Sequence, residues 1–135
     1  MVRKICVLID DDPADRALFA SAMVNVACDF DVLVFGNAQE AIRKIRDREI
    51  IPDVIFLDMN MPGINGYQFL VYLKGQIRYS RIPVIAYSTT ADPLERMRTR
   101  KMGAAGFFER PAACSELSSK LTEMLADIRI LNTAK

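Results

Sequence analysis

The chain has 135 residues, and its 18 basic and 17 acidic side chains leave a formal net charge of +1. This length fits one domain around one core, and the near-neutral charge provides no overall field that would draw nucleic acid or an anionic membrane. The sequence contains no histidine, which excludes Ser-His-Asp catalysis and histidine metal ligation from within the chain. No apolar run is long enough to span a bilayer, and the N-terminus lacks a signal-peptide pattern, so we expect a soluble cytoplasmic protein.

Short apolar runs alternate with longer segments of helical period along the chain. The runs are continuously apolar, which is typical of strands that are covered by helices on both faces of a parallel sheet. Strands are expected at residues 5–9, 32–35, 54–57, 84–87 and 106–108.

The segments between these runs carry helix start signals. Asp12 and Asp92 each precede a proline, and Asn37 lies three residues before Glu40. A short polar side chain followed by a proline, or by an acid three residues on, is typical of a helix N-terminus. The longer segments are therefore predicted to be helices.

Strands that alternate with helices predict an α/β fold with a doubly wound, five-stranded parallel sheet and helices on both of its faces. We expect one (βα)5 domain over residues 1–135, with a core at about 4–128 and a short C-terminal tail at 129–135. Ligands of such sheets bind at the carboxyl ends of the strands, so functional residues are expected just after the strands.

Polar side chains follow four of the predicted strands. Asp10 and Asp11 follow the first, Asp58 the third and Ser88 the fourth, and Arg110 comes after the fifth. If the first and third strands are neighbours, the three carboxylates face one another and repel unless a cation lies among them. Oxygen ligands alone suit Mg²⁺, with Mn²⁺ as an alternative, better than they suit zinc. The sequence therefore predicts an acidic Mg²⁺ pocket.

Such a pocket favours phosphoryl chemistry at a carboxylate. Positive charge within it would neutralise an arriving phosphoryl group, which makes Asp58 a candidate nucleophile that forms an acyl phosphate. Ser88 would donate a hydrogen bond to a phosphoryl oxygen, and Arg110 would offset its charge. Each residue alone also fits a solvated loop, so the hypothesis depends on their combination.

Four segments at these positions are distinctive: LIDDDPADR, LDMNMPGINGY, PVIAYST and GAAGFFERP. Together they resemble the receiver domains of two-component response regulators, and the resemblance extends over about residues 4–125. It implies a flavodoxin-like strand order, 2-1-3-4-5.

The resemblance implies a role for each acid in the pocket. Asp58 would accept a phosphoryl group from a histidine kinase or a phosphotransfer protein. Asp10, Asp11 and Asp58 would hold Mg²⁺ together with the backbone carbonyl of Asn60. The loop around the metal would be shaped by Asn60, Pro62, Gly63 and Gly66.

The resemblance also implies a conformational switch. Ser88 matches the hydroxyl residue that moves toward the phosphoryl group, Phe107 matches the aromatic residue that swings with it, and Pro111 matches a proline that the family holds in cis. The surface of the fourth helix, fifth strand and fifth helix would then bind a downstream protein. That surface carries a basic cluster of Arg96, Arg98, Arg100 and Lys101. The cluster is either a solvated helix face or a partner site.

Arg110 departs from the family pattern, which has lysine at this position. Arginine keeps the positive charge but presents a larger, planar fork that prefers bidentate contacts. Two arrangements stay open from the sequence. Arg110 bridges to Asp58 or to the phosphoryl group, or it points outward and leaves the pocket less cationic.

The working hypothesis is a stand-alone signalling switch, not an enzyme, which is a monomer or weak dimer and acts through other proteins. Few residues follow the fifth helix, so we expect no DNA-binding or catalytic effector and no membrane contact in this chain. The main alternative is a pseudo-receiver that uses the same fold as a constitutive interaction module. A phosphohydrolase of the aspartyl-phosphate type is less favoured, because it would need an acid where the chain has Asn60. A nucleotide-binding domain would need a glycine-rich loop after the first strand to bind phosphate. This chain has the segment IDDDPAD there, whose carboxylates would repel phosphate.

Overall fold

The structure is a computed structural model that describes residues 3–26, 30–61, 63, 65–89, 92–111 and 113–133, with the backbone alone at 114 and 129–133. Strands and helices alternate along these residues. In chain order they are β1 (Lys4–Ile9), α1 (Pro13–Val24), β2 (Phe30–Phe35), α2 (Ala38–Arg46), β3 (Val54–Asp58), α3 (Gly66–Lys74), β4 (Val84–Ser88), α4 (Pro93–Lys101), β5 (Gly106–Glu109) and α5 (Cys114–Thr133).

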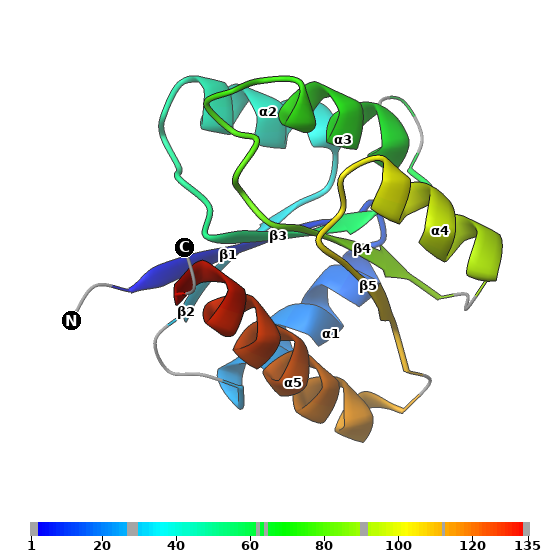
Figure 1. Cartoon of the computed structure of the whole chain (residues 1–135). Coiled ribbons are helices and arrows are strands. Elements are labelled where there is room, and N and C mark those ends of the chain that lie inside the picture. Colours follow the sequence, from blue (N-terminus) through cyan, green and yellow to red (C-terminus); the bar gives the residue numbers. More distant parts are fainter. Residues whose placement is uncertain are drawn as a thin grey trace.

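The strands form one parallel sheet in the order β2-β1-β3-β4-β5. Helices α2, α3 and α4 lie on one side of this sheet, and α1 and α5 lie on the other (Figure 1). The predicted fold class and strand order are confirmed. The central strands β1, β3 and β4 are almost entirely buried, as their continuous apolar runs indicate.

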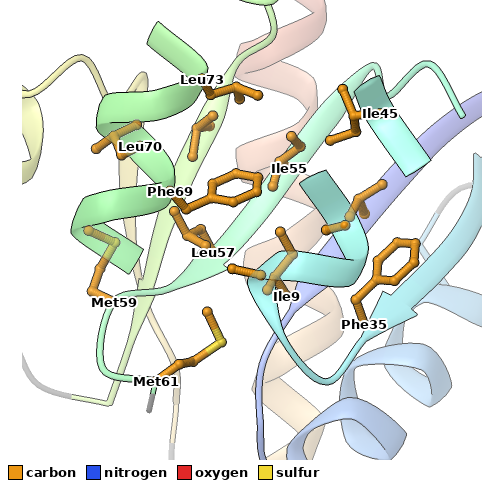
Figure 2. Packing of buried hydrophobic residues seen from close by; sticks show 14 of the residues in the cluster. Ile9, Phe35, Ile45, Ile55, Leu57, Met59, Met61, Phe69, Leu70 and Leu73 are labelled. Carbon is orange, nitrogen blue, oxygen red and sulfur yellow. The ribbon is translucent and has the colours of Figure 1, made fainter. Parts of the chain in front are cut away.

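Two apolar clusters hold the layers together. One fills the space between the sheet and the helices α2 and α3, where Phe69 packs among residues of β1 and β3 (Figure 2). The other lies under α1 and α5 and contains a group of packed aromatic rings. In it the ring centroids of Phe19 and Phe56 are 5.2 Å apart, and those of Tyr87 and Phe108 are 5.5 Å apart. Both clusters continue up to the residues at the carboxyl ends of the strands.

The loop that follows β3 is fixed to the first cluster by alternate side chains. Met59 and Met61 are 1% and 5% exposed and pack toward α2 and α3 (Figure 2), whereas Asn60 between them is exposed. Buried side chains on both sides of Asn60 restrict the path of the backbone directly after Asp58. The position of Asp58 therefore depends on core packing beyond the strand itself.

The predicted helix caps are present at three helices. The Asp12 carboxylate accepts a hydrogen bond from the Ala14 amide at the start of α1, and Asp92 accepts one from the Leu94 amide at the start of α4. Asn37 accepts a bond from the amide of Glu40 at the start of α2. Each bond satisfies an amide that has no partner within its own helix.

Helix α3 begins with a cap that the sequence reading missed. The side chain of Asn65 accepts from the Gln68 amide, and the Gln68 side chain accepts from the Asn65 amide, which is a reciprocal capping box. Gly66 is the first residue of this helix. The residue expected to help shape the loop around the metal thus starts a helix, and it packs closely against the backbone of Asp58 and Met59. Pro62, expected in the same loop, lies outside the described residues.

Two further expectations for the C-terminal third need correction or extension. The peptide bond before Pro111 is trans, since no peptide bond between described residues is cis. The expectation of a cis bond there is wrong, and the trans form is the intrinsically favoured one. Helix α5 continues to Thr133, so part of the stretch expected as a tail is helical. Over the described part of the chain, no helix has the length and apolar content needed to cross a membrane.

The close packing of Gly66 leads to a stability prediction. A Cβ atom at this position would lie 2.4 Å from Met59 Cα and 2.6 Å from the Asp58 carbonyl oxygen, which are backbone atoms. Gly66→Ala is therefore expected to lower the free energy of unfolding by about 1–3 kcal/mol, measured by urea denaturation. Gly75→Ala is the matched control, since Gly75 follows α3 with an ordinary φ of −78° and a Cβ there would lie 3.2 Å from the Val71 carbonyl oxygen, farther than the contacts at Gly66, so alanine should cost less there. Equal losses in the two variants would contradict this account.

Candidate functional site

Three carboxylates meet at the carboxyl edge of the sheet. Ile9 of β1 pairs with Leu57 of β3, so the next residues, Asp10 and Asp58, emerge side by side. Ligand oxygens of Asp10, Asp11 and Asp58 all lie within 4.8 Å of one another. The structure thus brings together the acids that the sequence predicted to share a pocket.

Asp10 is the most buried of the three acids, with only 2% of its surface exposed. Burial, with smaller contributions from the charges of Asp58, Asp15 and Asp11, raises the pKa of Asp10 to about 7. The Asp12 amide opposes this rise by donating a 2.9 Å hydrogen bond to the Asp10 carboxylate. A cation in the pocket would relieve both the desolvation and the repulsion.

Asp58 is only partly buried, so that an approaching group can reach it. Burial is the main cause that raises the pKa of its carboxyl, and the charge of Asp11 adds to the rise. The Asn60 amide donates a 3.0 Å hydrogen bond to Asp58 Oδ1, which opposes the rise and orients the carboxylate. The Asp58 carboxylate is therefore both accessible from solvent and held in one orientation.

A hollow of about 190 Å³ opens beside these acids. Ser88 at the end of β4 lines it and is 6% exposed, and Asn60 and Thr89 line it as well. The Ser88 carbonyl accepts a 2.7 Å bond from the backbone amide of Arg110, which ties the ends of β4 and β5 together. The predicted hydroxyl and the acids thus share one hollow.

The donor set fits a hard divalent cation. Its members are carboxylate oxygens, with no histidine in the chain to compete, and oxygen ligands select Mg²⁺ or Mn²⁺ rather than zinc. Burial is the main cause that raises the pKa of both Asp10 and Asp58, and the neighbouring acids add to the rise; a bound cation would counteract both causes.

A family model described as the response regulator receiver domain matches residues 6–122. The chain belongs to the receiver-domain family. Among curated relatives, response regulator Rre1 of Synechocystis is 28% identical over 120 residues, which cover 89% of this chain and 51% of that protein. The chain spans between 13% and 53% of the length of the first curated relatives that it matches.

Solved structures show the same fold. A phosphorylated cyanobacterial phytochrome response regulator, RcpA, matches with a TM-score of 0.82 at 24% identity, covering 91% of each chain. The Mn²⁺-bound form of response regulator Rcp1 matches with a TM-score of 0.79 at 18% identity, covering 90% of this receiver domain and 91% of that chain.

Arg110, at the position where the family pattern has lysine, adopts neither of the two arrangements left open by the sequence. It lines the hollow with Asp58, but its guanidinium forms an ion pair with Asp15 of α1. This contact is the main cause that raises the pKa of Arg110. Both side chains are largely buried, at 21% and 18% exposure, so water screens the pair less than it screens a surface pair.

Sequence reasoning missed two residues of this hollow, Asp15 and Tyr87. Asp15 lies in the first turn of α1, and that turn lies over the carboxyl edge of the sheet. The unusual Arg110 was the one signal that could have prompted a search for an acidic partner. Tyr87 belongs to the aromatic cluster, and burial raises the pKa of its hydroxyl while nearby Arg110 opposes the rise. No sequence pattern indicates that Tyr87 lines the hollow.

The expected basic cluster on α4 is divided between two neighbours. The Arg96 guanidinium lies 4.8 Å from the ring centroid of Phe107 in β5, and that of Arg98 lies 4.1 Å from the ring of Tyr67 in α3. These are cation–π distances, and they point the two side chains in different directions. Phe107 is partly buried beneath Arg96. Arg98 therefore separates from Arg96, whereas Arg100 lines one hollow together with Arg96 and Phe107.

The raised pKa of Asp10 predicts how stability depends on pH in the absence of divalent cations. Between the unfolded value of 3.8 and the folded value of about 7, the folded protein holds a proton that the unfolded chain releases. Stability is therefore lost as pH rises through this window. Asp10→Asn in EDTA should be more stable than wild type at pH 8, by roughly 1–3 kcal/mol, and the gain should vanish near pH 4. Urea denaturation at both pH values measures this, and a gain of the same size at both would refute it; exposed Asp47→Asn is the control.

Proposed function

We propose that this receiver domain is a phosphorylation-dependent switch in which Asp58 is the phosphoryl acceptor. The observation that carries the proposal is the meeting of Asp58 with Asp10 and Asp11 within 4.8 Å, beside a hollow lined by Ser88. The donor is a phosphohistidine of a histidine kinase or a phosphotransfer protein. Membership of the receiver family supports this choice.

The proposed transfer uses the carboxylate of Asp58 directly. One of its oxygens forms a bond to phosphorus as the bond between phosphorus and the donor imidazole nitrogen breaks, and the imidazole leaves with that electron pair and takes up a proton. The Asn60 amide holds the carboxylate in place during the reaction. The domain would otherwise show only self-phosphorylation from small phosphodonors and loss of its own phosphoryl group.

We place a Mg²⁺ ion, with Mn²⁺ as an alternative, at Asp10, Asp11, Asp58 and the backbone carbonyl of Asn60. Bound there, the ion supplies positive charge for the incoming phosphoryl oxygens. The fit of the oxygen donors supports this assignment. Burial of Asp10 keeps its carboxylate away from bulk water, which strengthens its interaction with any cation in the pocket.

The response to phosphorylation would run from Ser88 to the α4-β5-α5 face. Ser88 donates a hydrogen bond to the phosphoryl group, and Phe107 repacks against α4 as Ser88 moves. Arg96 lies against the Phe107 ring, so the same movement would change the surface that α4 presents. A downstream protein that prefers the shifted form would then bind this face. The proposal includes a monomer or weak dimer. It also includes a cytoplasmic location, which agrees with the free, buried thiol of Cys6.

One observation favours a second candidate, the pseudo-receiver that acts as a constitutive interaction module. Arg110 is held by Asp15, so the cation that would contact a phosphoryl group is already paired. Asp15 also adds negative charge to the hollow that the phosphoryl group must enter. Both effects oppose phosphorylation. Whether Asp58 accepts a phosphoryl group therefore separates the two candidates.

The first experiment tests phosphorylation itself. Wild type incubated with Mg²⁺ and acetyl phosphate should gain the mass of one phosphoryl group in intact mass spectrometry, because Asp58 is reachable and oriented. Asp58→Asn should not gain it, whereas Asp47→Asn, which changes an exposed acid next to the end of α2, should gain it as wild type does. If wild type gains mass neither from acetyl phosphate nor from a phosphorylated histidine kinase, the protein is a pseudo-receiver.

The second experiment tests whether Asp15 restrains Arg110. Asp15→Asn removes a carboxylate from the hollow and frees the guanidinium, so phosphorylation from acetyl phosphate should accelerate about fivefold, which corresponds to roughly 1 kcal/mol of barrier. Asp12→Asn is the matched control, because asparagine also caps a helix and Asp12 does not line the hollow. Asp15→Asn combined with Arg110→Ala should lose part of the gain. An unchanged rate in Asp15→Asn would show that the pair does not limit phosphorylation.

A further inference from the structure

A second hollow lies at the opposite edge of the sheet from Asp58. It has a volume of about 220 Å³ and lies where the chain enters β3 and β4, between the α2–β3 and α3–β4 connections. Both connections lie on the side of the molecule away from the carboxyl ends of the strands (Figure 1). The apolar part of its lining comes from Ile45, Ile50, Ile51, Pro52, Tyr79 and Ile82.

Two arginines complete this lining, Arg48 and Arg78. Both are exposed, and within the described part of the chain neither takes part in an ion pair. The acids closest in sequence are already engaged. Asp47 pairs with Arg46 at 3.3 Å, Glu49 pairs with Lys44 at 3.4 Å, and Asp53 accepts a 2.7 Å hydrogen bond from the Ile5 amide. The hollow is therefore apolar at its centre with uncompensated positive charge on its wall.

The backbone at Arg48 gives an independent indication that this side chain has a use. Arg48 has a φ of +59° and is the one non-glycine residue with positive φ among the described residues. It follows the C-cap of α2, where its amide bonds to the Ile45 carbonyl and the Glu49 amide bonds to the Lys44 carbonyl. This is a Schellman arrangement, in which glycine is the favoured residue at that position. The chain thus keeps an arginine where glycine would be less strained.

Two large apolar side chains, one in the lining of the hollow and one next to a lining residue in the sequence, are exposed to solvent. Ile51 is 73% exposed, and Ile77, next to Arg78, is 95% exposed. Exposed isoleucines beside a tyrosine and two arginines give the surface the composition of a protein interface, with an apolar centre and a charged rim. A volume of about 220 Å³ is below the usual range for drug-sized ligands and suits a single bulky side chain.

We propose that this edge is a docking site for a partner protein, and that it binds a segment in which acidic residues flank one bulky apolar side chain. The apolar side chain enters the hollow, and the acids pair with Arg48 and Arg78. The charge of the two free guanidiniums selects an acidic segment over a basic one. The proposal does not depend on phosphorylation of Asp58, since the two sites lie at opposite ends of the strands.

The test uses a short synthetic peptide of alternating Glu and Leu with one central Phe, added to isotope-labelled full chain and followed by amide NMR shifts. Saturable shifts are expected at residues 45–52 and 77–82, and they should weaken as salt is raised. A peptide with every Glu replaced by Lys, and one with every Leu and Phe replaced by Ser, should cause no such shifts. Shifts confined to other surfaces, or equal shifts with all three peptides, would overturn the proposal.

Variants separate docking from folding. Arg48→Gly should keep or raise the urea midpoint, because glycine suits the backbone there, while it weakens peptide binding about tenfold. Arg78→Ser should weaken binding similarly, and Arg100→Ser, which changes an exposed arginine of α4 outside the hollow, should not. All three should still be phosphorylated as wild type is, so failure of docking is distinguishable from failure of the switch. Binding to phosphatidylglycerol vesicles without peptide shifts would overturn the proposal in favour of a membrane surface.

Discussion

The burial of Asp10 and the closeness of its carboxylate to those of Asp11 and Asp58 are the constraint on which the rest of the site depends. Three carboxylates whose oxygens lie within 4.8 Å of one another are costly to hold together, and burial of Asp10 increases the cost. The fold therefore has to supply rigidity from elsewhere. The parallel pairing of β1 with β3 supplies it first, because Ile9 and Leu57 are fixed as neighbours and the acids that follow cannot separate.

The loops then fix the directions of the side chains. Buried Met59 and Met61 hold the chain on both sides of Asn60, whose amide orients Asp58. Gly66 allows α3 to start against the backbone of residues 58 and 59, and the Asn65–Gln68 capping box fixes that start. At Asp10, the Arg16 guanidinium donates a 2.8 Å hydrogen bond to the backbone carbonyl. Core packing, a close backbone contact and helix capping thus all converge on the geometry of two carboxylates.

The parts of this arrangement that the sequence predicted are those with a local or periodic signal. Continuous apolar runs indicated the buried strands, and Asp12, Asn37 and Asp92 indicated helix starts within a few residues of themselves. The acids after β1 and β3 were foreseen because parallel topology places strand ends together. The parts that were missed depend on contacts across the fold. No local signal connects Asp15 with Arg110, far apart in the chain, or sends Arg96 and Arg98 toward different aromatic rings.

The pair of Asp15 and Arg110 also explains how arginine fits where the family pattern has lysine. A planar guanidinium needs an acceptor with matching geometry, and at this edge Asp10, Asp11 and Asp58 already surround the proposed cation position. An acid in the first turn of α1 supplies a separate acceptor, and it keeps the guanidinium largely buried without drawing it onto Asp58. The charge that lysine would direct at the phosphoryl group is thus balanced within the protein. In the proposed switch, the pocket would therefore rely more heavily on a divalent cation than a lysine-containing pocket would, since its own positive charge is already neutralised by Asp15.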